Sequence, residues 1–132
     1  MDKEKVVICS SMSFRKEINE WKDELENNKY QVIKFPEEFT GDFLLGYKKE
    51  FSEHYQKIAE ADILFVLNIE KNGEEGYIGA SVFAEIAFAI GLNRSYNKNI
   101  KVYCLNKFTE SLPYYEELKY WEQLGWLDYW QK

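Results

Sequence analysis

The stretch that most constrains the fold is the short apolar run ILFVL at residues 63–67. Its residues favour β-strands, and none of them is polar, so the run offers no solvent-facing side. A strand of this kind must be covered on both faces, as the inner strands of a parallel sheet are. The run therefore predicts a central strand with helices packed against both faces of its sheet.

Shorter apolar runs and helical patterns alternate along the rest of the chain. The predicted strands are 6–9, 30–35, 63–67 and 100–105, and the predicted helices are 14–27, 47–61, 80–91 and 114–124. Residues 37–46 contain two glycines and no clean period, which predicts a loop or a short irregular helix. Strands that alternate with helices predict an α/β fold. We expect a three-layer sandwich with a mostly parallel, flavodoxin-like (Rossmann-like) sheet of four to five strands.

The length of 132 residues suits one domain, 1–132, and a hydrophobic share of 45% excludes a disordered chain. A formal charge of −6 and the lack of a basic stripe argue against binding to a nucleic-acid polymer. The first apolar run, 6–9, is too short for a signal peptide or a membrane span. We therefore expect a cytoplasmic protein without a membrane partner.

Both cysteines, Cys9 and Cys104, lie inside apolar strand runs with no nearby Cys or His at metal-ligand spacing. Each is predicted to be a buried free thiol. The loops likewise lack a cluster of His, Cys and Asp at ligand spacing, so neither a metal nor another cofactor is expected.

Parallel sheets bind ligands at the carboxyl ends of their strands, near the switch in strand order. Here these ends lead into two loops, 10–13 and 68–79. The first offers three hydroxyl groups followed by Arg15, which could hold a phosphate or ribose hydroxyls, although Ser13 could equally serve as a helix cap. The second runs into GYIGAS, 76–81, whose glycines permit close backbone approach to a phosphate or sugar. A plain strand-to-helix turn is the alternative for that segment.

Glu85 is a single acid among the apolar residues of the helix predicted at 80–91. An ionised carboxylate buried beside Phe83 and Ile86 is costly unless it is paired or used, so we expect Glu85 to face a cleft or to have a dedicated partner. Near a helix start, the dipole and free amides would keep it ionised and ready to attack an electrophilic carbon. The alternative is a carboxylate that a tyrosine or lysine holds for a structural reason.

Three segments together resemble the nucleoside 2-deoxyribosyltransferase-like superfamily. They are ICSSMSF from residue 8, ADILFVLN from residue 61 and NGEEGYIGASVFAEIAFA from residue 72, and the resemblance spans about residues 6–105. In that superfamily a glutamate on the helix after the third strand attacks the anomeric carbon of a nucleoside. The covalent glycosyl-enzyme that results is resolved by a second base or by water. The resemblance assigns this role to Glu85.

The substrate-binding residues expected from the matching loops are Ser10, Ser11, Met12, Phe14, Asn68, Tyr77, Gly79 and Ser81. Two aspartates of the superfamily are missing. One lies six residues before the nucleophile, where this chain has Gly79 and nucleotide-cleaving relatives have a phosphate-binding serine. The other lies eight residues before the acid of the AD pair and corresponds to His54. A histidine could supply the acid or hydrogen-bonding role of that carboxylate, although a lone histidine beside apolar residues is more often structural.

Two functions follow from these residues. The first is a nucleoside or nucleotide N-glycosidase or 2-deoxyribosyltransferase, in which Glu85 acts as nucleophile and His54 assists. One carboxylate could suffice, because it stabilises the positive charge that builds on the sugar as the N-glycosidic bond breaks. The alternative is a non-catalytic nucleotide-binding or sensing module, since Gly79 and His54 stand where the superfamily has acids.

The C-terminal segment 114–130 indicates assembly, because it carries more large apolar side chains than one helix face can bury. Members of the superfamily are commonly dimers or larger, with residues of a neighbour at the mouth of the active site. We expect a homodimer with these aromatic residues and helix 80–91 at or near the interface. The alternative is a tail that folds over an open edge of its own sheet.

Overall fold

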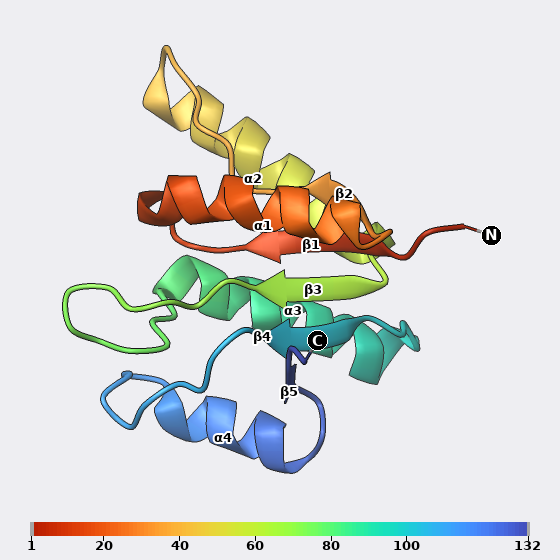
Figure 1. Ribbon diagram of the computed structural model, residues 1–132, viewed down its shortest axis with the longest axis vertical. Coiled ribbons are helices and arrows are strands. Elements are labelled where there is room, and N and C mark those ends of the chain that lie inside the picture. The colour runs from red at the N-terminus through yellow and green to blue at the C-terminus, as the bar shows by residue number, and fades with distance from the viewer. Residues whose placement is uncertain (1, 132) are drawn as a thin grey trace.

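Five short strands form one sheet in the order β2-β1-β3-β4-β5, and every neighbouring pair runs parallel. The computed structural model describes residues 2–131, and Figure 1 shows how strands and helices alternate. In chain order the elements are β1 (Lys5–Cys9), η1 (Met12–Phe14), α1 (Arg15–Asn27), β2 (Gln31–Lys34), α2 (Phe43–Glu60), β3 (Ile63–Val66), α3 (Ala80–Tyr96), β4 (Lys101–Cys104), α4 (Tyr115–Gln123) and β5 (Asp128–Tyr129). The expected flavodoxin-like α/β sandwich with a parallel sheet is confirmed.

The central strand β3 is buried along its whole length, as its apolar run predicts. Its side chains alternate between two cores, because successive residues of a strand point to opposite faces. Leu64 and Val66 enter the core shared with α2, α3 and α4, whereas Ile63 and Phe65 enter the core beneath α1. In Figure 1, α1 lies in front of the sheet and α3 behind it. Helices therefore cover both faces of β3.

The strand order reverses at β1, since the chain leaves β1 for β2 on one side and returns to β3 on the other. The carboxyl ends of β1 and β3 thus meet at the switch point where sheets of this kind bind ligands. The register aligns Cys9 with Val66 and Val66 with Cys104, so both cysteines lie in one row across the sheet. Both are buried free thiols, as predicted.

Two helices are longer than the sequence indicates. α2 begins at Phe43, four residues earlier than predicted, because the Asp42 side chain accepts a hydrogen bond of 2.9 Å from Leu45 N and caps the helix. α3 continues to Tyr96, and it ends where Asn97 adopts the left-handed backbone conformation with φ 57°. The predicted helix end at residue 91 is therefore wrong. Residues 37–46 are predicted to be a loop or a short irregular helix, but residues 43–46 belong to the regular helix α2.

The first turns of α2 extend beyond the sheet, at the top of Figure 1. Three large apolar side chains in these turns are open to solvent: Phe43, Leu44 and Leu45 are 65%, 72% and 69% exposed. Exposed apolar groups do not follow the period of a buried helix face, which explains why the sequence pattern misses this start. These turns are the part of the helix that the chain itself leaves uncovered.

The C-terminal aromatic residues pack largely on their own chain. β5 pairs with β4 and extends the sheet by one strand. Trp130 contacts the rings of Tyr30, Phe65 and Tyr103 edge-on, with centroid distances of 5.3 to 5.5 Å. The tail thus covers its own sheet, which is the alternative to the interface expected for it.

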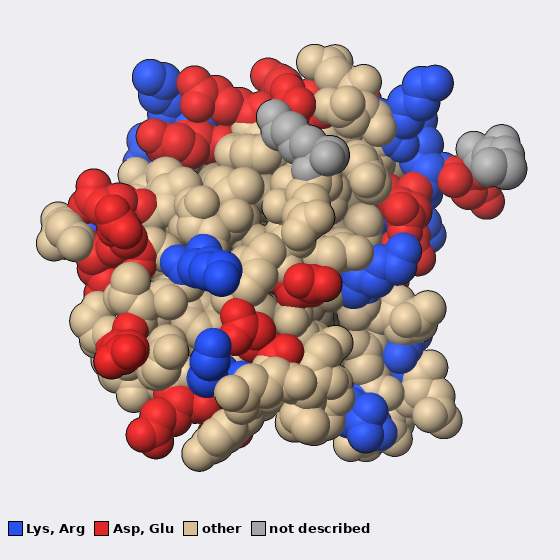
Figure 2. Space-filling view, turned by 60° about the horizontal axis from the view of Figure 1, so that its bottom comes forward, with Lys and Arg blue, Asp and Glu red and all other residues tan. Residues whose placement is uncertain are grey.

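Charged side chains of both signs are interspersed on the face drawn in Figure 2. None of the helices within residues 2–131 combines the length and the hydropathy that a membrane span requires.

Candidate functional site

A cavity of about 600 Å³ opens beside the carboxyl end of β1. The loops after β1 and β2, the inward side of α2 and the N-terminal part of α3 surround it. Its lining residues are Ser10, Ser11, Met12, Pro36, Glu37, Phe39, Tyr47, Glu50, Phe51, His54, Tyr55, Tyr77, Gly79, Ala80, Ser81, Val82, Ala84 and Glu85. The cavity therefore lies where the strand order predicts a ligand site.

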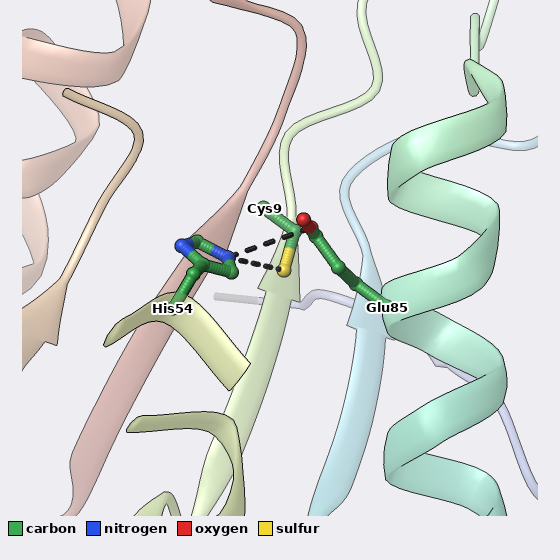
Figure 3. Close-up of side chains that lie close together, drawn as sticks. All are labelled: Cys9, His54 and Glu85. Carbon is green, nitrogen blue, oxygen red and sulfur yellow. Dashed lines mark hydrogen bonds and ion pairs between the residues drawn. The ribbon is translucent and has the colours of Figure 1, made fainter. Parts of the chain in front are cut away.

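Three polar side chains from three elements meet at this cavity. Figure 3 shows Cys9 of β1, His54 of α2 and Glu85 of α3 pointing toward one another. His54 Nε2 lies 3.4 Å from Cys9 Sγ and 3.4 Å from Glu85 Oε1. The partner expected for the isolated acid is therefore a histidine, not a tyrosine or a lysine.

The local folding of each element explains this meeting. Cys9 is the last residue of β1, and its side chain enters the core on the side of α2 and α3. His54 and Ile58, one turn apart, are the buried residues of α2, so the histidine is drawn against the sheet. Glu85 precedes the buried Ile86 on α3, and 16% of its side chain stays exposed. The carboxylate therefore stands at the boundary between core and cavity.

Burial first, and then the charge of Glu85 and a hydrogen bond to it, raise the pKa of the Cys9 thiol well above its ordinary value. Cys9 is thus a neutral thiol, and not the thiolate that a cysteine nucleophile requires. Burial and the same glutamate also raise the pKa of Tyr55, on the adjacent wall, to about 12. Both neighbours of the carboxylate therefore keep their protons.

The start of α3 does not support the charge of Glu85 as expected. The first turn of α3 contains no acidic residue, and Glu85 lies in the second turn, beyond the free amides. Because the dipole effect fades within the first turn, the predicted stabilisation of Glu85 by the helix start is wrong. The polar group beside the carboxylate is instead His54, whose Nε2 lies 3.4 Å from Glu85 Oε1.

Gly79 caps α3, and the Tyr77 ring occupies the space beside it. A Cβ atom at Gly79 would lie 3.0 Å from Tyr77 Oη, which is tighter than most real contacts of a Cβ. An aspartate at this position would therefore require the tyrosine to move. The Tyr77 hydroxyl thus lies beside the space that an aspartate side chain at position 79 would enter.

An aromatic wall borders the cavity on the side of α2. Tyr47, Phe51 and Tyr55 follow one another at a spacing of four residues, with ring centroids 5.9 Å and 4.2 Å apart. All three lie in the helix predicted at 47–61, and their spacing of four residues places them on one helix face. The spacing cannot show that Tyr47 and Phe51 remain 48% and 46% exposed and face an open cavity. Flat aromatic surfaces of this kind stack nucleobases.

Six of the eight predicted substrate-binding residues line the cavity: Ser10, Ser11, Met12, Tyr77, Gly79 and Ser81. Phe14 does not, because it is buried in the core beneath α1. Asn68 does not either: its Nδ2 donates to Asn106 O at 2.7 Å, and its Oδ1 accepts from Asn106 N at 3.0 Å. Asn68 therefore joins the loops after β3 and β4.

The serines of the first loop are already hydrogen-bonded within the chain. Ser10 Oγ donates to Leu67 O at 2.9 Å, and Ser11 Oγ accepts from Ser13 N at 3.3 Å. Ser11, rather than Ser13, is the residue that caps the helical turn η1. Lys71 Nζ reaches Ser11 Oγ at 3.3 Å from the loop after β3. These bonds hold the rim of the cavity in place.

The lining is acidic, with Glu37, Glu50 and Glu85, and no lysine or arginine is among its residues within the described part of the chain. Lys34 lies behind it and is bound by Glu37 and Glu50 at 3.0 Å and 2.9 Å. Burial alone would lower the pKa of the Lys34 ammonium, but these hydrogen bonds outweigh burial and raise it. Arg15, expected near a phosphate, instead pairs with Glu38. The charges of the cavity thus suit an uncharged ligand.

No protein-family model matches the chain, and a search of curated proteins finds no match. The geometry and the chemistry of the cavity therefore carry the functional assignment.

Proposed function

We propose that the protein breaks the N-glycosidic bond of a nucleoside, as an N-glycosidase or a 2-deoxyribosyltransferase, with Glu85 as the nucleophile. The observation that carries this proposal is the Glu85 carboxylate on the wall of a cavity of about 600 Å³, 3.4 Å from Nε2 of a buried histidine and flanked by aromatic rings. Drug-sized and nucleoside-sized ligands occupy cavities of this volume.

The chemistry assigns a separate task to each group. One carboxylate oxygen of Glu85 attacks the anomeric carbon, and the base departs with the electron pair of the C–N bond and takes up a proton from solvent. His54 donates its Nε2 proton to Oε1, which leaves the other oxygen free to attack. Water or an acceptor base then attacks the same carbon and releases the carboxylate. His54 is thus the positioning residue of the nucleophile.

The proposed substrate is a free nucleoside rather than a nucleotide. A 5′-phosphate would meet Glu85 in a lining whose described residues include no lysine or arginine. Of the nearby cations, Lys34 is already bound by Glu37 and Glu50, and Lys71 reaches the rim at Ser11. Like charges at close range disfavour binding, because few water molecules remain between them to screen the repulsion. The rings of Tyr47, Phe51 and Tyr55 would stack on the base.

A panel of nucleosides and nucleoside monophosphates, with and without an acceptor base, tests the proposal when the free base is followed by chromatography. We expect release from at least one nucleoside and a loss of roughly 10³-fold or more in Glu85→Gln, because the amide cannot form the glycosyl ester. Glu122→Gln is the matched control, since Glu122 is also hydrogen-bonded but belongs to α4. Absence of release from every substrate, or equal release by Glu85→Gln, removes the proposal.

A second candidate is a nucleoside or nucleotide sensor without turnover. The favouring observation is Gly79, which stands where the superfamily has a carboxylate and where a Cβ atom would lie 3.0 Å from the Tyr77 hydroxyl. A thermal shift upon addition of nucleosides that persists in Glu85→Gln, without any product, would select the sensor over the enzyme.

A homodimer is proposed as well, and the first turns of α2 support it better than the C-terminal tail does. Phe43, Leu44 and Leu45 are consecutive apolar residues and each is more than half exposed, whereas Trp130 of the tail packs on its own sheet. Light scattering at micromolar concentration should give the mass of a dimer. A monomer mass would remove the homodimer proposal.

A further inference from the structure

Three side chains of the types that bind transition metals converge in this chain, although they come from distant parts of the sequence. We propose that Cys9, His54 and Glu85 form a binding site for a divalent transition metal ion, with Zn²⁺ preferred, whose fourth position opens into the cavity. Figure 3 shows the three ligand groups facing one centre from β1, α2 and α3.

The distances between the ligand atoms suit a tetrahedral ion. A zinc ion about 2.0 to 2.3 Å from each ligand separates an imidazole nitrogen from a sulfur or a carboxylate oxygen by about 3.3 to 3.6 Å. The two observed distances from His54 Nε2, to Cys9 Sγ and to Glu85 Oε1, are both 3.4 Å. All three ligand atoms lie within 4.8 Å of one another, so a small rotation of the Glu85 side chain completes the set.

The donor set selects the kind of ion. A thiolate and an imidazole favour zinc and its neighbours, whereas Mg²⁺ and Ca²⁺ require oxygen ligands. Binding replaces the proton of the Cys9 thiol by the metal and releases that proton to solvent. In the metal-bound state the imidazole carries its proton on Nδ1 and offers the lone pair of Nε2, and Glu85 supplies one carboxylate oxygen. No electron is transferred in this exchange.

The second cysteine shows that a buried thiol alone does not make such a site. Cys104 lies in the same row of the sheet and is also buried. Within residues 2–131, the group at Cys9 is the one that brings three metal-binding side chains together. His54 and Glu85 both line the cavity, so an ion between them faces open space on its fourth side. Zinc sites with three protein ligands and an open position bind water or a substrate there.

Metal binding would also affect the proposed reaction, because Glu85 is both a metal ligand and the nucleophile. An ion bound to one oxygen of the Glu85 carboxylate withdraws electron density from both oxygens, so the carboxylate becomes a weaker nucleophile and the covalent intermediate forms more slowly. This consequence rests on the proposed function, whereas the metal site itself does not. Zinc would therefore act as an inhibitor of that activity, which chelators relieve.

Titration of the full chain with Co²⁺ tests the site directly, without any substrate. The chain carries one histidine and two cysteines, so a protein freed of its purification tag offers little background. We expect a thiolate-to-cobalt charge-transfer band in the near ultraviolet, strong visible bands of tetrahedral cobalt, and loss of both when Zn²⁺ displaces the ion. Glu85→Gln should weaken binding, and Cys9→Ser should abolish the charge-transfer band.

Cys104→Ser is the matched control and should retain both the band and the binding stoichiometry. Because Glu85 is partly exposed, Glu85→Gln should fold even if a substitution at the buried Cys9 does not. The proposal is overturned if the wild-type chain gives no thiolate band with Co²⁺, if Cys104→Ser loses the band instead, or if Glu85→Gln binds Co²⁺ and Zn²⁺ as tightly as the wild type does.

Discussion

The two buried thiols occupy equivalent places in the sheet and have different surroundings. Cys9 and Cys104 flank Val66 in the same row, at the carboxyl ends of β1 and β4. At Cys9, α2 and α3 bring a histidine and a glutamate to the thiol, beside an open cavity. At Cys104, burial first and then the charge of Glu122 raise the thiol pKa to about 12, and the neighbourhood is closed by α4 and β5.

The difference follows from the topology of the sheet. β1 lies at the switch in strand order, where the connecting helices diverge and leave a crevice, whereas β4 and β5 follow one another in space as in sequence. Near β5, the polar groups pair with each other: Tyr129 Oη donates to Glu122 Oε2, and Lys119 Nζ lies 2.8 Å from Glu122 Oε1. One end of the row is therefore suited to bind a ligand, and the other end holds the fold together.

Among the variants that test this difference between the two ends, Leu118→Ala in α4 should have the largest effect, which is on stability. Leu118 is fully buried in the core that also contains Cys104, so the lost side chain leaves a cavity and costs about 2 to 5 kcal/mol of unfolding free energy. Denaturant unfolding measures this loss. Activity per folded molecule should stay close to that of the wild type, because α4 does not line the site. A large loss of activity in the folded variant would contradict the separation of a ligand-binding end at Cys9 from a structural end at Cys104.

The sequence predicts the fold far better than it predicts the different surroundings of Cys9 and Cys104. The apolar run at 63–67 is confirmed as the central strand, because a strand buried on both faces has a pattern that few other structures share. The meeting of Cys9 with His54, 45 residues apart, depends on how α2 crosses β1, and no local period encodes that packing. For the same reason the spacing of ligand residues along the loops gives no indication of a metal site. Six of the eight predicted lining residues are found at the cavity because loops at the switch point follow from the strand order alone.

The next largest effect should come from His54→Ala, which removes the imidazole whose Nε2 lies 3.4 Å from Glu85 Oε1. We expect kcat to fall by roughly 10²-fold with little change in KM, because a positioning residue acts on the reacting geometry more than on substrate binding. His54→Gln places an amide nitrogen near the position of Nε2 and should restore part of the rate. Steady-state kinetics on the best nucleoside measure both. Equal kcat in His54→Ala and the wild type would assign the histidine a purely structural role.

The smallest effect should come from Glu122→Gln at the closed end of the row. Hydrogen bonds from Lys119 and Tyr129 lower the pKa of the Glu122 carboxyl below its ordinary value of 4.5. A carboxyl whose pKa is lower in the folded chain stabilises the fold above its ordinary pKa, and this contribution is lost as the pH falls through the lower folded value. The wild type should therefore exceed Glu122→Gln slightly in thermal midpoint at neutral pH.

Thermal unfolding of both proteins from about pH 7 to about pH 3 checks this sign, because the two midpoints should converge on acidification. A difference that grows as the pH falls would mean that Glu122 is not the stabilising charge of this end.

The most direct measurement of the central claim is the location of a covalent sugar on the chain. A nucleoside with fluorine at C2′ slows the hydrolysis of a glycosyl-enzyme, since fluorine destabilises the positive charge that develops on the sugar. After incubation and trypsin digestion, residues 72–94 form one peptide that contains Glu85 together with Glu74 and Glu75. Fragmentation in the mass spectrometer then places the adduct. We predict a sugar adduct on Glu85 in the wild type and none in Glu85→Gln. An adduct on another residue, or none with a nucleoside whose base the protein releases, would contradict Glu85 as the nucleophile.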